Sequence, residues 1–134
     1  MSAALLPGAR VGLVEISGIL GAGFGAIAYE GRDTRSGSKV VLKEYFPLRI
    51  ADREDGGPRL TPQSEAEAAE FEAGRTQFVA LYETLSRIEH PSLPGVLELI
   101  ETHDTSYAVM PHRAGESLEL SLIHISEPTR LWHI

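Results

Sequence analysis

Residues 19–29 read Ile19-Leu20-Gly21-Ala22-Gly23-Phe24-Gly25-Ala26-Ile27-Ala28-Tyr29, and the rest of the fold can be read outward from them. Upstream, Val11–Leu20 carries Val, Leu and Ile between short polar breaks, and Ala26–Tyr29 is a second apolar run after the glycines. Short apolar runs bounded by glycine are typical of strands. The pattern therefore predicts two strands that form a hairpin around a glycine-rich turn.

A third strand is predicted after the polar segment Asp33–Ser38, whose Asp, Ser and Gly residues favour a turn. This strand covers Lys39–Lys43, and Pro47 ends it. The next segment, Pro47–Pro62, is polar, contains Gly and Pro, and has no usable periodicity. We therefore expect it to be an irregular loop.

A helix is predicted to begin at Ser64, because Glu67 follows three residues later in the arrangement of a capping box. Gly74 should weaken or break this helix, since glycine costs about 1 kcal/mol relative to alanine in a helix interior. His90-Pro91 should end it. The residues expected to form its buried stripe recur at helical spacing; they are Phe78, Leu81, Tyr82, Leu85 and Ile88.

Two further strands, Val96–Glu101 and Tyr107–Met110, are predicted around a turn at His103-Asp104. The element order is then βββαββ. This order predicts an α+β fold with a five-stranded antiparallel sheet and one main helix. With 134 residues, the chain has room for one compact domain or one lobe of a larger one.

Composition excludes several classes of protein. Apolar residues make up 43% of the chain, which is enough for a core. The net charge of −7 argues against non-specific binding to nucleic acid. No run is long and apolar enough to span a membrane, and there is no secretory signal. The chain has no cysteine, which excludes a disulfide scaffold and is consistent with a cytoplasmic location.

The glycine-rich turn suggests contact with phosphate, because backbone N–H groups can approach phosphate oxygens where no Cβ intervenes. A dinucleotide-binding loop is excluded, since it needs a helix directly after the glycines and a strand is predicted here. The Gly-Lys-Ser/Thr of a Walker loop is absent. A glycine-rich hairpin without a ligand remains the alternative.

The order strand, glycines, strand, and then a strand ending in lysine resembles the small lobe of protein kinases, and bacterial serine/threonine kinases most of all. The resemblance extends from Leu6 to Glu119. Its further pieces are Leu42-Lys43-Glu44-Tyr45-Phe46-Pro47, Phe71, Gly74 and Phe78 before His90-Pro91, and Tyr107-Ala108-Val109-Met110 before Gly115-Glu116-Ser117-Leu118.

The resemblance implies that ATP, with Mg²⁺ in an intact domain, is bound by Gly21, Ala22, Gly23, Ala28, Val41, Lys43, Met110 and His112. Lys43 matches the strand lysine that contacts the α- and β-phosphates. Met110 falls at the gatekeeper position, and His112 belongs to the hinge that follows it. No catalytic residue is expected in this chain, because the catalytic-loop and Asp-Phe-Gly motifs are absent. The histidines are too scattered to suggest a metal site.

The chain departs from the kinase pattern at two positions. Leu81 stands where an active kinase has the glutamate that pairs with the lysine, and Gln77 is the nearest polar substitute. Val41 stands where the family has a small alanine beside the adenine ring. Two interpretations stay open: the ATP-binding lobe of a serine/threonine kinase, with a protein substrate, or a degenerate scaffold or regulatory binding module. An unrelated small α+β binding domain is a third.

The last residues are expected not to belong to the fold. Leu120–Arg130 resembles the in-frame translation of a sequencing adapter, and the only tryptophan, Trp132, lies beyond it. Residues 1–119 are then a partial kinase-like lobe and residues 120–134 a non-native tail. A genuine C-terminal strand, Leu120–Ile125, is the alternative.

Overall fold

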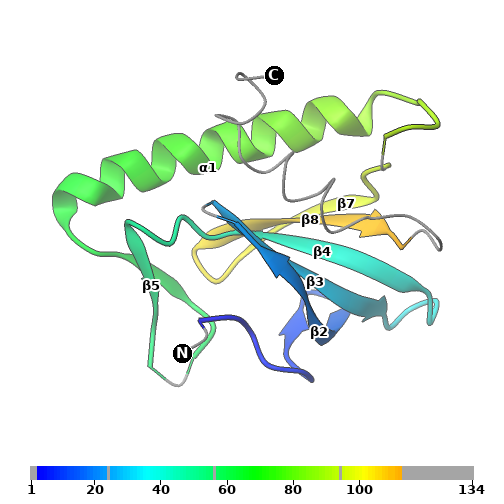
Figure 1. Ribbon diagram of the computed structural model, residues 1–134, viewed down its shortest axis with the longest axis horizontal. Coiled ribbons are helices and arrows are strands. Elements are labelled where there is room, and N and C mark those ends of the chain that lie inside the picture. Colours follow the sequence, from blue (N-terminus) through cyan, green and yellow to red (C-terminus); the bar gives the residue numbers. More distant parts are fainter. Residues whose placement is uncertain (1–2, 24, 56, 94, 113–134) are drawn as a thin grey trace.

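The computed structural model describes residues 3–23, 25–55, 57–93 and 95–112. A six-stranded antiparallel sheet carries one long helix, α1, across one of its faces (Figure 1). The strand order in the sheet is β1-β2-β3-β4-β8-β7. The strands are β1 (Arg10–Val11), β2 (Val14–Ala22), β3 (Ala26–Asp33), β4 (Lys39–Tyr45), β7 (Glu98–Thr102) and β8 (Thr105–Pro111).

The predicted α+β class is confirmed, and the five expected strands are β2, β3, β4, β7 and β8. The sixth strand, β1, was not predicted as a separate element. It arises because Gly12 adopts a left-handed φ of 57° and turns the chain back, so that Val11 pairs with Val14.

Strand β4 lies at the centre of the sheet, between β3 and β8, in unbroken antiparallel register with both. Every residue from Val40 to Tyr45 is buried, whereas Lys39 at the strand's start is exposed. A central strand is covered on both faces, so its sequence need not alternate between apolar and polar residues. The strand also runs two residues beyond the predicted end at Lys43.

The predicted turn at His103-Asp104 is confirmed as the two-residue connection between β7 and β8. Both residues adopt left-handed backbone angles, with φ of 57° and 59°. Two-residue hairpin loops of this kind match the right-handed twist of the flanking strands.

Helix α1 covers Glu65–Ser86 and begins at the predicted cap. The N–H of Glu67 donates to Ser64 Oγ at 3.3 Å, and Ser64 Oγ donates to the Glu67 carboxylate at 2.6 Å. The prediction that Gly74 breaks the helix is wrong, since α1 passes through it without interruption. The helix ends at Ser86, four residues before His90.

The buried face of α1 differs from the predicted stripe. Phe78, Tyr82 and Leu85 are buried as expected. Phe71, about two helical turns before Phe78, is buried on the same face. Leu81 is only partly buried. Ile88 is 43% exposed because the helix has already ended before it.

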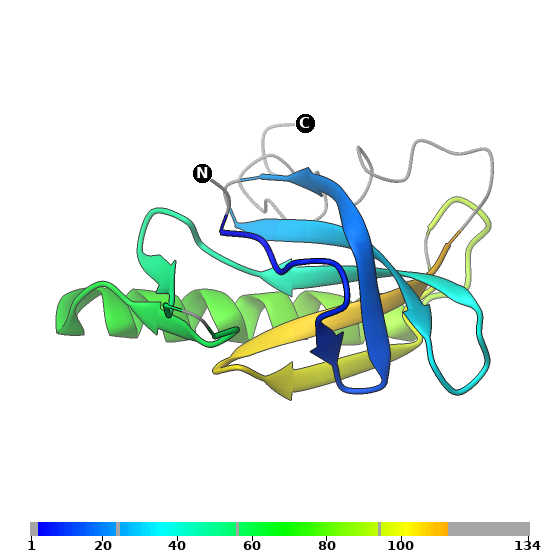
Figure 2. The same ribbon diagram turned by 90° about the horizontal axis from the view of Figure 1, so that it is seen from below.

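The segment Pro47–Pro62, predicted to be irregular, contains a second small sheet in which β5 (Ala51–Arg53) pairs with β6 (Leu60–Pro62). Its apolar residues Ala51 and Leu60 are buried, so tertiary packing orders a segment of weak local preference. The N-terminal segment, residues 3–9, lies on the side of the sheet opposite α1 (Figure 2). Within the described residues, no helix is both long and apolar enough to cross a membrane.

Candidate functional site

One row of directly paired residues crosses the sheet from the glycine turn and consists of Gly21, Ala28, Lys43 and Ala108. Gly21 of β2 pairs with Ala28 of β3, Ala28 pairs with Lys43 of β4, and Lys43 pairs with Ala108 of β8. Directly paired residues of antiparallel strands point to the same face. The row therefore places three residues with little or no side chain beside one lysine.

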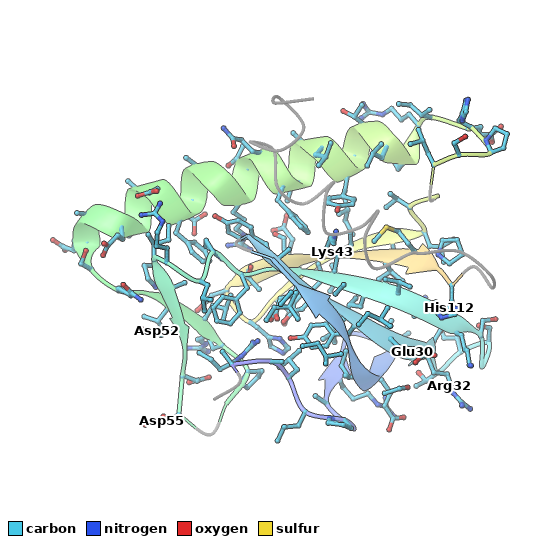
Figure 3. All side chains as sticks on the ribbon, in the orientation of Figure 1. Glu30, Arg32, Lys43, Asp52, Asp55 and His112 are labelled. Atoms are coloured by element: carbon cyan, nitrogen blue, oxygen red, sulfur yellow. The ribbon has the colours of Figure 1, made fainter. Side chains whose placement is uncertain are left out.

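This row faces α1. Tyr45, two residues after Lys43 on the same strand, packs its ring against Phe71 and Phe78 of the helix, with centroids 5.1 and 5.7 Å apart. Side chains two residues apart on a strand share a face. Lys43 therefore points toward α1, and its side chain is fully buried (Figure 3).

A second row lies next to the first on the same face. Glu30, Val41 and Met110 are paired across β3, β4 and β8. Val41 and Met110 are fully buried, and the Glu30 side chain is 32% exposed. The face thus changes from small residues at Lys43 to larger apolar ones and then to a carboxylate at its edge.

Backbone hydrogen bonds close the glycine turn and attach it to the residue that follows β4. The N–H of Gly23 donates to the carbonyl of Ala26 at 2.9 Å, and the N–H of Phe46 donates to the carbonyl of Gly25 at 2.9 Å. Ala22 is exposed. Phe24 lies outside the described residues. In this conformation the Gly23 N–H is engaged within the hairpin and does not point to a ligand.

His112 lies just beyond β8, at the edge of the same face. Its N–H donates to the carbonyl of Lys39 at 3.4 Å, which continues the pairing of β8 with β4. Its Nε2 lies 3.8 Å from the Glu30 carboxylate, and Lys39 Nζ lies 3.7 Å from the same group. Figure 3 shows Glu30 and His112 close together at one end of the sheet. The rest of the expected hinge, from Arg113 onward, lies outside the described residues.

The two helix positions that the sequence analysis considered as anchors for Lys43 are Leu81 and Gln77. Leu81 is partly buried and packs against the core, so no carboxylate stands at that position. Gln77, the suggested substitute, is exposed. An exposed amide is not positioned to bind a buried ammonium, and we therefore discard the Gln77 hypothesis.

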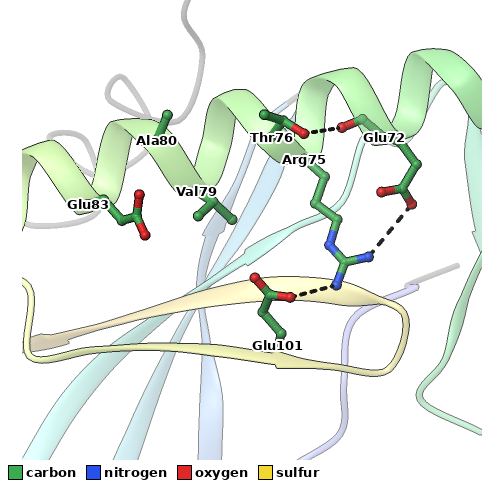
Figure 4. A pocket seen from close by; sticks show the side chains of 7 residues that line it. All are labelled: Glu72, Arg75, Thr76, Val79, Ala80, Glu83 and Glu101. Carbon is green, nitrogen blue, oxygen red and sulfur yellow. Dashed lines mark hydrogen bonds and ion pairs between the residues drawn. The ribbon is translucent and has the colours of Figure 1, made fainter.

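Arg75 is a positioning residue that the sequence analysis missed. Its side chain is 20% exposed and donates to Ser106 Oγ at 2.9 Å and to the carbonyl of Thr105 at 3.0 Å. Figure 4 shows its guanidinium between the carboxylates of Glu72 and Glu101, each 3.6 Å away. These contacts fasten the middle of α1 to the start of β8, the strand that carries Met110.

The same contacts border an open pocket of about 360 Å³ between α1 and β7, which is also lined by Thr76, Val79, Ala80 and Glu83 (Figure 4). Three carboxylates and one guanidinium make it acidic. Across the part of the chain that the structure describes, no three His, Cys, Asp or Glu side chains are grouped so that they could hold a metal ion.

Neither a protein-family model nor a curated protein sequence matches the chain. Solved structures do. The apo form of PpkA-294 aligns with a TM-score of 0.82 and 28% identity, over 96% of this chain and 45% of that one. A variant of the PknI kinase domain of Mycobacterium tuberculosis aligns with a TM-score of 0.59 and 20% identity, over 84% and 38%. Another structure of the PknI kinase domain gives 0.55 and 19%, over 81% and 36%.

The chain spans less than half the length of these structures. The PknI comparisons show the fold alone, and the PpkA-294 comparison covers nearly the whole chain at higher identity. The sheet order, the single helix and the lysine within the third long strand agree with the family expected from the sequence. The chain has the small-lobe fold of bacterial serine/threonine protein kinase domains.

Proposed function

We propose that the chain is the ATP-binding lobe of a serine/threonine protein kinase. The observation that carries the proposal is the position of Lys43, which is fully buried and lies in one row with Gly21, Ala28 and Ala108 on the face toward α1. Small neighbours allow the phosphates of a nucleotide to approach a lysine closely, because no bulky side chain stands beside it.

Several described residues would contact ATP. Lys43 would pair with the phosphates, and Ala28, Val41 and Met110 would supply an apolar wall for the base. Bound with the nucleotide, Mg²⁺ would neutralise part of the phosphate charge. The backbone next to His112 would lie at the edge of the base.

The chain alone is not expected to transfer phosphate. Phosphoryl transfer in kinases needs a catalytic-loop aspartate and the metal-binding Asp-Phe-Gly, and neither motif occurs in the sequence. A protein substrate or a regulatory partner, and a cytoplasmic location, belong to the proposal for the complete kinase. So does the assignment of residues 1–119 to the lobe and of residues 120–134 to a non-native tail.

Calorimetric titration of the 134-residue chain with Mg-ATP measures its affinity and tests the proposal. The chain has only two lysines, so Lys39 offers a matched control for Lys43. Loss of a charge-assisted contact in Lys43→Met should weaken the affinity roughly ten-fold or more. Lys39 is 66% exposed, and Lys39→Met should leave the affinity within about two-fold of the parent. Equal effects of the two substitutions would contradict the proposal.

A degenerate scaffold or regulatory binding module is the second candidate. Leu81 favours it, because this partly buried leucine cannot hold the lysine as the family's glutamate does. The buried Val41 favours it as well, since its two extra methyl groups narrow the base pocket relative to alanine. A chain that folds but shows no heat of binding with Mg-ATP, with or without Leu81→Glu, would support this second candidate.

A further inference from the structure

Directly behind Lys43 lies a second buried charge, Glu44. The two residues are consecutive on β4 and point to opposite faces of the sheet. Glu44 is fully buried, and its carboxylate accepts four hydrogen bonds. Tyr29 Oη donates at 2.7 Å, Tyr107 Oη at 2.8 Å, and the two terminal nitrogens of Arg53 at 2.8 and 2.9 Å. We call these four residues the Glu44 cluster.

The direction of each bond in the Glu44 cluster is determined. Burial first, and then the charge of Glu44, raises the pKa of both the Tyr29 and the Tyr107 hydroxyls, so both remain protonated donors. The N–H of Leu5 donates to Tyr29 Oη at 3.0 Å. His103 Nδ1 lies 2.8 Å from Tyr107 Oη, and it must donate there because the single hydroxyl proton is directed at Glu44.

The Glu44 cluster stands back to back with the candidate nucleotide row. Tyr29 follows Ala28 on β3, Glu44 follows Lys43 on β4, and Tyr107 precedes Ala108 on β8. Each of the three central strands therefore contributes one residue to the row on the α1 side and the adjacent residue to the cluster on the other side. The two tyrosine hydrogen bonds join β3 and β8 to β4 at the level of Lys43, and the two from Arg53 join β5 to β4.

Arg53 connects the cluster to the elements that cover this face. Its Nε donates to the carbonyl of Ala3 at 2.8 Å, and one terminal nitrogen donates to the carbonyl of Pro58 at 2.7 Å. Its guanidinium lies 5.1 Å from the centroid of the Phe46 ring. The N-terminal segment and the β5–β6 hairpin are thus joined to β4 through one bidentate ion pair.

We propose that Glu44 and Arg53 are positioning residues that hold Lys43 in place for the nucleotide from the opposite face of the sheet. The inference rests on the proposed function. Its alternative is that the ion pair serves stability alone. These roles differ in a measurable way. A purely structural role changes the free energy of unfolding alone, whereas a positioning role also changes the Mg-ATP affinity of the folded chain.

The test measures stability and Mg-ATP affinity together in the 134-residue chain carrying Glu44→Met and Arg53→Met. Urea unfolding should still show a cooperative transition, with a midpoint lowered because the buried Tyr29 and Tyr107 hydroxyls lose their acceptor. Calorimetry should show Mg-ATP affinity weakened roughly five-fold or more, on the scale of one charge-assisted contact. An affinity within two-fold of the parent in a folded double variant would overturn the inference.

A single substitution keeps the test decisive if the double variant does not fold. Tyr107→Phe removes one donor to Glu44 and should weaken Mg-ATP binding by about three-fold. Tyr82→Phe is its matched control, since the Tyr82 hydroxyl is buried without a hydrogen-bond partner among the described residues. Equal affinities of these two variants would overturn the inference. A parent that does not bind Mg-ATP overturns the proposed function as well, whereas a parent sensitive to Lys43→Met but not to Tyr107→Phe overturns this inference alone.

Discussion

Gly74 should be required in the middle of α1 because of Tyr45. The Tyr45 ring is 6% exposed, and its hydroxyl donates to the carbonyl of Phe71 at 2.9 Å. A Cβ built at position 74 would overlap Tyr45 Oη and lie 3.2 Å from Cζ. Glycine thus forms a notch in the helix that receives the tyrosine hydroxyl.

The magnitude of Gly74→Ala follows from three contributions. Alanine gains about 1 kcal/mol over glycine in a helix interior. Displacing the Tyr45 hydroxyl loses a hydrogen bond worth about 1 kcal/mol, and overpacking a close-packed site costs roughly 1–3 kcal/mol. The free energy of unfolding should therefore fall by about 1–3 kcal/mol, although most exposed helix positions would gain from the same substitution.

A double-mutant cycle with Tyr45→Phe isolates this effect. Removing the hydroxyl leaves Cζ, at 3.2 Å, as the nearest atom, so Gly74→Ala should become neutral or stabilising by up to about 1 kcal/mol in that background. The coupling energy between the two positions should then be about 2 kcal/mol. Urea unfolding of the parent, both single variants and the double variant, followed by far-UV circular dichroism, gives all four values. A Gly74→Ala variant more stable than the parent, or a coupling below about 0.5 kcal/mol, would refute the reasoning.

Three further predictions concern the site and its surroundings. Leu81→Glu should strengthen Mg-ATP binding up to about ten-fold by restoring a carboxylate near Lys43, and Val41→Ala should strengthen it independently by widening the base pocket; calorimetry that shows no change for either would contradict both. Burial, the largest effect on His103, lowers its pKa below the ordinary 6.5, so the unfolded chain takes up this proton at higher pH than the folded one. The stability linked to His103 is therefore complete above pH 6.5 and is lost as pH falls through the lower folded pKa. The substitution His103→Asn suits the left-handed turn and keeps a donor for Tyr107. This variant should lose less melting temperature between pH 7.5 and 5.5 than the parent does.

Much of the fold could be predicted from the sequence because its signals are local. The hairpin around the glycines depends on two apolar runs and the turn residues between them, and the start of α1 depends on Ser64 and Glu67, three residues apart. The turn at His103-Asp104 is equally local. Such elements are set by neighbouring residues, so a single chain carries enough information to place them.

The sequence also predicts a strand that covers Lys39–Lys43 and therefore ends at Lys43. The burial of Lys43 and its alignment with Ala28 and Ala108 follow from the pairing of β4 with β3 and β8. Pairing register depends on strands that are far apart in the sequence. The role expected for this lysine comes from the family resemblance, whereas its neighbours Ala28 and Ala108 are known only from the pairing register of β4 with β3 and β8.

Only the tertiary structure decided the remaining features, because each depends on a partner distant in the chain. The sequence predicts that Gly74 breaks the helix, whereas in the structure the Tyr45 hydroxyl occupies the space that a side chain at position 74 would need. The β5–β6 hairpin has little local preference, and Arg53 is joined to Glu44 in another strand. Glu44 follows directly after the predicted strand Lys39–Lys43, and the structure shows that it belongs to the buried strand β4. A charge in such a strand requires a partner, but the sequence does not say which of ten arginines provides it.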